Sequence, residues 1–232
     1  MGDVACIDIS HWQGFPDFEK VAADGVLAVI LKATEGTSYV DPNRKTNYAA
    51  ATKAGLACCC YFWLKPGASA REQAEFFLAT VDPIEGERVV IDYEEEGCTL
   101  QGLREAVQAL LDCDRNLQIA VYSGHLLKQQ LGDSCDEFLR DNTSLWLAHY
   151  TTGAPSWPAG TWPQWSLWQF TDEGSVAGIE GNCDCNRFNG SDDALLDWIG
   201  PAGEEELVEP LTVTIEIDVP PGVAVKVVER RR

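Results

Sequence analysis

The chain has 232 residues, 45% of them hydrophobic and 23% charged, which is typical of a globular protein. Eight Trp, eight Phe and six Tyr exclude disorder as the main state. Lysine and arginine total 17 and aspartate and glutamate total 37, so the net charge is −20. A surface this acidic repels phosphate, so we expect no nucleic-acid partner. No apolar run reaches the roughly 18 residues of a membrane span, so we expect no membrane insertion.

The first 140 residues alternate short apolar strands with helical segments. A helix is predicted to begin after Asp17 and to end at Gly25, and a later one is predicted to break near Gly132. The predicted strands cover residues 4–9, 27–33, 56–63, 88–92 and 118–122. The predicted helices cover residues 18–24, 43–54, 70–81, 100–112 and 125–140. This alternation predicts an α/β fold with a parallel sheet.

The pattern changes after residue 140. Three short strands are predicted at 145–149, 166–170 and 184–188, without a convincing helix between them, and a short helix follows at 193–199. Five β-α units followed by three strands make eight strands. At this chain length, eight strands predict an irregular TIM-like barrel that lacks its last helices.

Nine cysteines are present, and Cys58, Cys59 and Cys60 are consecutive in an apolar run. Because neighbouring side chains on a strand point to opposite faces, these three cannot all pair with one another. We interpret them as small buried hydrophobic residues. No pair of cysteines has zinc-site spacing, and we expect neither a metal nor another cofactor. The first residues show no signal peptide, which together with free thiols favours synthesis in a (host) cytoplasm.

Acidic residues stand at the ends of predicted strands. Asp8 ends the first strand, Asp92 and Glu94 end the fourth, and Asp184 lies at or just before the start of the eighth. The carboxyl ends of parallel barrel strands meet at one face, and that face carries the chemistry. We therefore expect these four side chains to lie together.

Asp92 and Glu94 are two positions apart, so they project in the same direction while Tyr93 points away. Two carboxylates held close together suppress each other's ionisation, which leaves one protonated near neutral pH. Glycosidic cleavage needs this arrangement, because one carboxylic acid protonates the leaving oxygen and one carboxylate stabilises the positive charge.

Other interpretations stay open at this point. Glu95 and Glu96 are interpreted as a solvated loop. The four carboxylates could instead be oxygen ligands of a metal-dependent phosphodiesterase. A chitinase-like barrel glycosidase also ends a strand with this acid pair, although its longer DxxDxDxE pattern is absent before Asp92. A sugar-binding module without activity is a further alternative, and no GxSxG motif supports a serine hydrolase.

Four sequence blocks, in order, resemble those of glycoside hydrolase family 25, the Chalaropsis-type lysozymes. They are DISHWQG at 8–14, KATEGTSYVDP at 32–42, VIDYE at 90–94, and a closing block made of LWQFT at 167–171 and GIEGNCDCNRF at 178–188. The resemblance extends from about Val4 to Ile199. It implies a barrel of five β-α units and three strands, the same fold that the strand pattern predicts.

The resemblance also implies an activity: hydrolysis of the β-1,4 bond between N-acetylmuramic acid and N-acetylglucosamine in the glycan strands of peptidoglycan. By position, Glu94 is then the general acid and Asp92 a stabilising neighbour, while Asp8 and Asp184 tune this pair or hold the substrate. The implied substrate-binding residues are Tyr61, Trp146, Tyr150 and Gln169.

Two details stay open. After Tyr61 the family often continues with His-Phe, whereas this chain has Phe62 and Trp63. The muramic acid N-acetyl group could attack its own anomeric carbon, or water could attack directly. With no leader visible, a phage endolysin is the natural version of such an enzyme.

The composition shifts again at Pro201. An acidic stretch at 204–209 leads into alternating apolar and polar residues at 211–219 and 223–227, around a Pro220-Pro221-Gly222 turn. This predicts a β-hairpin, and a lone hairpin needs a partner for its apolar face. The barrel wall, a second copy and the cell envelope are candidates. We divide the chain into a muramidase barrel at 1–200 and an acidic linker with a hairpin tail at 201–232, and self-association through 211–228 is one hypothesis.

Overall fold

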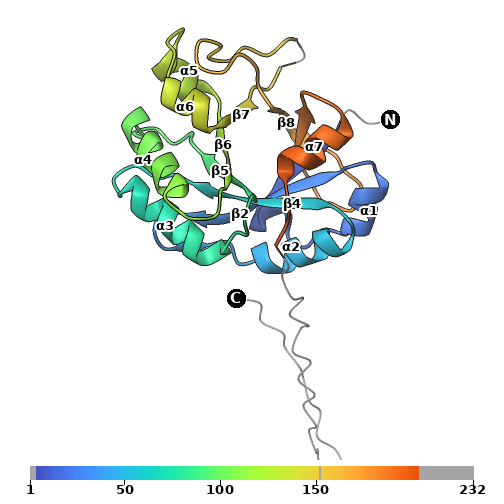
Figure 1. Cartoon of the computed structure of the whole chain (residues 1–232). Coiled ribbons are helices and arrows are strands. Elements are labelled where there is room, and N and C mark those ends of the chain that lie inside the picture. Colours follow the sequence, from blue (N-terminus) through green and yellow to red (C-terminus); the bar gives the residue numbers. More distant parts are fainter. Residues whose placement is uncertain (1–3, 152, 204–232) are drawn as a thin grey trace, which may run out of the picture.

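The computed structural model describes residues 4–151 and 153–203, which form an eight-stranded barrel surrounded by helices (Figure 1). The barrel strands are β1 (Cys6–Ile9), β2 (Ala28–Glu35), β4 (Ala57–Trp63), β5 (Arg88–Asp92), β6 (Gln118–Ser123), β7 (Ser144–Ala148), β8 (Leu167–Gly174) and β9 (Cys183–Phe188). The helices are α1 (Phe18–Ala23), α2 (Arg44–Lys53), α3 (Ala70–Val81), α4 (Leu100–Leu111), α5 (His125–Leu131), α6 (Glu137–Asn142) and α7 (Asp192–Ile199). The predicted hairpin tail lies outside the described residues.

The barrel closes because β1 pairs with both β2 and β9. The prediction of five β-α units followed by three strands is confirmed. One feature differs, since β9 runs antiparallel to both of its neighbours, β1 and β8. Only residues 175–182 join β8 to β9, fewer than the dozen or so that a parallel crossover needs, whereas the longer segment 149–166 joins β7 to β8 and that pair is parallel. A short strand, β3 (Tyr39–Val40), also pairs antiparallel with β2.

The helix ends follow the expected signals. The side chains of Asp17 and Ser69 accept backbone N–H groups in the first turns of α1 and α3. The predicted helix at 125–140 is two helices, α5 and α6, and Gly132 ends the first with a φ of 53°. This left-handed conformation suits glycine, which lacks the Cβ that penalises it in other residues.

Alternation along the strands creates two apolar layers. Cys58 and Cys60 belong to the layer between sheet and helices, whereas Cys59 points into the barrel, and all three are fully buried. This confirms the interpretation of these residues as small hydrophobic side chains on opposite faces. All nine cysteines are free.

Helix α7 covers the barrel at the end where the parallel strands begin. Leu195 and Ile199 join the inner apolar layer. Beneath them, Arg88 at the start of β5 donates from Nε to the carbonyl of Trp198 at 2.7 Å and stacks 4.3 Å from its ring centroid. The opposite end of the barrel, where the predicted acids stand, is left open for a site. None of the described helices has the length and apolarity needed to cross a membrane.

Candidate active site

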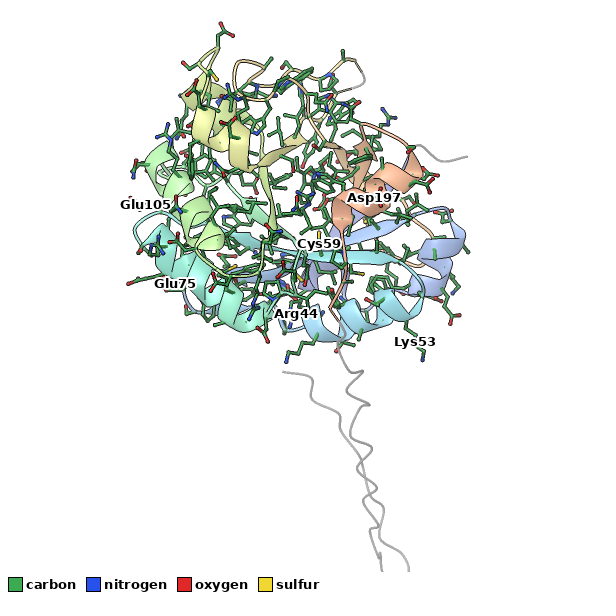
Figure 2. The ribbon with its side chains drawn as sticks, viewed as in Figure 1. Arg44, Lys53, Cys59, Glu75, Glu105 and Asp197 are labelled. Atoms are coloured by element: carbon green, nitrogen blue, oxygen red, sulfur yellow. The ribbon has the colours of Figure 1, made fainter. Side chains whose placement is uncertain are left out.

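A cavity of about 250 Å³ opens at the carboxyl ends of the parallel strands. All eight residues that the sequence assigned to the site line it. They are Asp8, Tyr61, Asp92, Glu94, Trp146, Tyr150, Gln169 and Asp184. Trp63, Tyr122 and Asp172 complete the lining. Figure 2 shows the side chains of the molecule on the same ribbon, with Cys59 labelled on β4, the strand that continues to Tyr61 and Trp63.

Asp92 and Glu94 lie together in this cavity, whereas Tyr93 is buried on the other side and hydrogen-bonds Gln130. Burial raises the pKa of Asp92 well above its ordinary value, and the neighbouring Glu94 raises it further. Oδ1 of Asp92 is buried without a hydrogen-bond partner among the described residues. This oxygen is shielded from solvent, although the Asp92 side chain lines the cavity.

Glu94 is exposed to the cavity, but the surrounding protein still removes water from its carboxyl. This desolvation raises the pKa of Glu94, and the charges of Asp184 and Glu95 act in the same direction. A carboxyl with a raised pKa keeps its proton closer to neutral pH, as a general acid must.

Asp8 and Asp184 face each other on paired strands. They are register partners of antiparallel β1 and β9, which explains why a residue at the start of β9 reaches the same end of the barrel as the end of β1. Burial and the charge of Asp184 raise the pKa of Asp8. Burial also raises the pKa of Asp184 to about 6, with Asp172 adding to the shift. The pair therefore holds a proton more readily than isolated aspartates do.

Amide donors hold the buried Asp8 carboxylate. Nε2 of Gln169 lies 3.0 and 2.9 Å from its two oxygens, and Nδ2 of Asn186 lies 2.8 Å from Oδ2. Nε1 of Trp146 in turn donates to Oδ1 of Asn186 at 2.7 Å. Gln169 and Trp146 thus orient the carboxyl groups as well as lining the cavity.

A second network, not predicted from the sequence, borders the acid pair. Lys32 is buried on β2, donates to Glu35 at 2.7 Å and lies 4.7 Å from the Trp63 ring centroid. Its positive charge opposes the rise in the pKa of Asp92. Glu95 accepts from Nε1 of Trp63 and from Nζ of Lys65, each at 3.0 Å. The interpretation of Glu95 as a solvated residue is therefore wrong, whereas Glu96 is exposed as expected.

Sequence reasoning missed four polar residues around the site: Lys32, Tyr122, Asp172 and Asn186. Two of them had a signal. Tyr122 ends the predicted fifth strand, and Asn186 follows Asp184 by two positions and so shares its face of the strand. In the described part of the chain, no three His, Cys, Asp or Glu side chains are arranged to hold a metal ion.

Residues 7–179 match the family model for glycosyl hydrolases family 25. The chain is 29% identical over 205 residues to lysozyme M1 of Streptomyces globisporus, which covers 82% of this chain and 69% of that protein. It is also 29% identical over 206 residues to the N,O-diacetylmuramidase of Chalaropsis sp., and this match covers 81% of this chain and 95% of that protein. The crystal structure of a bacterial lysozyme from Streptomyces coelicolor matches with a TM-score of 0.75 and 28% identity. The match covers 86% of this chain and 98% of the lysozyme chain.

These matches and the barrel with its acidic cavity agree on the class of protein. The family model spans most of the chain, so the chain belongs to glycosyl hydrolases family 25 and is a glycoside hydrolase. The resemblance noted in the four sequence blocks is confirmed.

Proposed function

We propose that this protein is a lysozyme that hydrolyses the β-1,4 bond between N-acetylmuramic acid and N-acetylglucosamine in peptidoglycan. The observation that carries the proposal is the pairing of Glu94, whose pKa is raised, with the buried Asp92 at the base of the same cavity. Relatives named as a lysozyme and an N,O-diacetylmuramidase support the substrate.

In the proposed reaction, Glu94 donates its proton to the oxygen of the leaving sugar as the glycosidic bond breaks. Asp92 faces the positive charge that develops at the anomeric carbon. Its carboxylate lines the cavity and is an acceptor for the N–H of a 2-acetamido group, and this contact would orient that group. Asp92 has a stabilising role whether the acetamido oxygen or a water molecule attacks.

The remaining lining suits a sugar. Tyr61, Trp63, Trp146 and Tyr150 offer aromatic rings, and such rings pack on the apolar faces of sugars. Gln169 and Asn186 keep Asp8 in place beside them. We propose that Asp8 and Asp184 hold the sugar and tune the acid pair.

The experiment is digestion of purified, de-lipidated peptidoglycan, followed by borohydride reduction and mass spectrometry of the products. The expected result is new reducing ends that are all muramic acid residues, produced equally with and without EDTA. Reducing ends on glucosamine residues would contradict the bond assignment, and dependence on a divalent cation would contradict the proposed chemistry.

We also propose that the chain folds in a reducing compartment, a cytoplasm, before it reaches the cell wall. The nine free cysteines support this, because an oxidising compartment tends to pair or oxidise thiols. Equal folding yields with and without a thiol reductant would contradict it. The phage origin stays a prediction.

A further inference from the structure

A second cavity, of about 500 Å³, adjoins the active-site cavity. The two share Glu94, Tyr122 and Tyr150 as lining residues. The rest of the second cavity is formed by the start of α5 and the end of β7. Glu96, Lys128 and His149 are among these lining residues. We call this second cavity the side groove.

The side groove carries a cation, Lys128, for which the described residues provide no ion-pair partner. Lys128 makes no ion pair or hydrogen bond through its ammonium group to any described residue, although acidic residues outnumber basic ones by 37 to 17 in the chain. Lys45 and Lys53 are likewise unpaired within the described chain, but both are exposed on α2 and line no part of either cavity. Lys128 is half-buried in the groove, and burial lowers its pKa.

His149 adds a second donor to the side groove. Its Nδ1 accepts the backbone N–H of Ser156 at 3.0 Å, so in the neutral ring the proton is on Nε2. Burial and the nearby charge of Lys128 lower the pKa of His149, which favours this neutral form. Its backbone is fixed, since its N–H donates to Gln169 and its carbonyl accepts from Nε1 of Trp168 at 2.7 Å.

The position of Glu94 decides which part of the substrate meets this groove. The acid must reach the oxygen that joins the two sugars, and Glu94 lines both cavities. Asp8, Asp92 and Asp184 all lie in the first cavity, so the sugar that develops positive charge binds there. The leaving fragment therefore extends into the side groove.

That fragment carries anions. It begins with N-acetylglucosamine and continues with the next muramic acid residue, whose lactyl carboxyl is either free or linked to a peptide that has carboxylates of its own. An ammonium group and an N–H donor in a half-buried groove form charge-assisted hydrogen bonds with a carboxylate. Glu96 is the one exposed acid in the lining of this groove besides the catalytic Glu94.

We infer that the side groove binds the leaving fragment of the glycan strand and that Lys128, assisted by His149, recognises a carboxylate on that fragment. This inference rests on the proposed muramidase function. It assigns Lys128 a role in substrate selection and none in bond cleavage.

The test compares the full-length wild type with Lys128→Gln, Lys128→Arg and Lys45→Gln. The last variant removes one exposed, unpaired positive charge elsewhere, and so controls for the change in net charge. The substrates are soluble glycan strands with peptides, the same strands freed of peptides by an amidase, and both preparations after their carboxyls are converted to methylamides. Initial rates give kcat and KM for each pair.

We expect Lys128→Gln to raise KM about tenfold on carboxylate-bearing strands with little change in kcat, the size of one partly exposed charge-assisted contact. Lys128→Arg retains most of the affinity, and Lys45→Gln matches the wild type. On methylamidated strands, the wild type and Lys128→Gln have equal KM values. An effect on peptide-bearing strands alone assigns the carboxylate to the peptide, and an effect on peptide-free strands alone assigns it to the lactyl group.

Equal KM values for wild type and Lys128→Gln on every strand would overturn the inference. So would an equal loss on the methylamidated strands, because Lys128 would then act without a carboxylate. Failure of the proposed function looks different, since the wild type would then release no muramic reducing ends from any of the four substrates.

Discussion

Gln169 binds Asp8 through a single amide nitrogen, which lies 3.0 Å from one carboxylate oxygen and 2.9 Å from the other. Its amide oxygen accepts from the hydroxyls of Tyr122 and Tyr150, at 2.7 and 2.8 Å. Each end of the Gln169 amide is therefore committed, which fixes its orientation. A residue on β8 thereby links a carboxyl on β1 to the tyrosines of the cavity wall, and the acid cluster is held in place before substrate arrives.

The first prediction concerns the general acid. Glu94→Gln keeps the shape of the side chain but removes its transferable proton. We expect the rate of peptidoglycan cleavage to fall by about 10²–10⁴-fold, the usual contribution of general acid catalysis. The melting temperature should be no lower than that of the wild type, because the surroundings of Glu94 disfavour its charge. The measurement is release of reducing ends, beside a thermal melt of each protein.

Glu105→Gln is the matched control for that variant. Glu105 is exposed on α4 (Figure 2), accepts from Gln101 and does not line the active-site cavity. It should cleave peptidoglycan at the wild-type rate. Glu94→Gln retaining more than about a tenth of wild-type activity would remove Glu94 from the acid role.

The second prediction concerns Asp92. Asp92→Asn replaces the carboxylate that lines the cavity with a neutral amide of the same shape. Because the carboxylate acts on charge that develops only in the transition state, kcat should fall at least 100-fold while KM changes less than about threefold. Steady-state kinetics on soluble glycan strands separate the two constants. A rise in KM with kcat preserved would assign Asp92 to binding instead.

The fold was predictable to the extent that local patterns determine it. Apolar runs such as 56–63 and helix caps such as Asp17 and Ser69 depend on neighbouring residues, so the strands and helices of the five β-α units were predicted to within a few residues. The direction of β9 depends instead on how the chain returns to β1. The sequence pattern within 183–188 does not predict whether this strand runs parallel or antiparallel to its neighbours.

The residues of the site likewise include some that local patterns predict and others that only the folded chain brings together. Asp8, Asp92 and Glu94 were predictable because strand ends converge in a barrel. Glu95 looked like its exposed neighbour Glu96, and only the folded chain places it against Trp63 and Lys65. Such contacts join residues about 30 positions apart, which a pattern within one segment cannot encode.

The third prediction concerns the closed end of the barrel. Arg88→Met removes the donor to the Trp198 carbonyl at 2.7 Å and the contact of NH1 with Ser144 at 3.2 Å. These half-buried acceptors would lose a charged partner, so we expect the free energy of unfolding to fall by about 1–3 kcal/mol. Urea unfolding curves measure the free energy of unfolding. Cleavage of peptidoglycan at low temperature should persist, because Arg88 lies at the end of the barrel away from the cavity. A loss below about 0.5 kcal/mol would show that α7 docks without this contact.

The fourth prediction concerns the tail. Ala202 packs against the outer apolar layer and Gly203 lies close to Glu87, so the described barrel extends to these residues. A chain cut after Gly203 should keep its melting temperature within a few degrees and still cleave soluble glycan strands. If the alternating residues 211–228 pair between copies, the full chain should scatter light as a larger species than the cut chain. Insoluble or unfolded cut protein would instead place the tail in the core of the barrel.

The last prediction concerns pH and Asp184. Its pKa is about 6 in the folded protein and 3.8 in an unconstrained chain, so the folded state binds more protons between these values. Stability contributed by this group is therefore present at low pH and lost as pH rises through that window.

Asp184→Asn removes the charge that costs stability above pH 6. We expect the variant to be about 1–3 kcal/mol more stable than wild type at pH 8 and equal to it near pH 3.5, with reduced activity. Thermal melts from pH 3.5 to 8 measure the difference, with Asp114→Asn, an exposed site, as the control that should follow wild type throughout. An Asp184→Asn variant that melts below wild type at pH 8 would show that the carboxylate stabilises the barrel through its contact with Asp8 more than it costs by its burial.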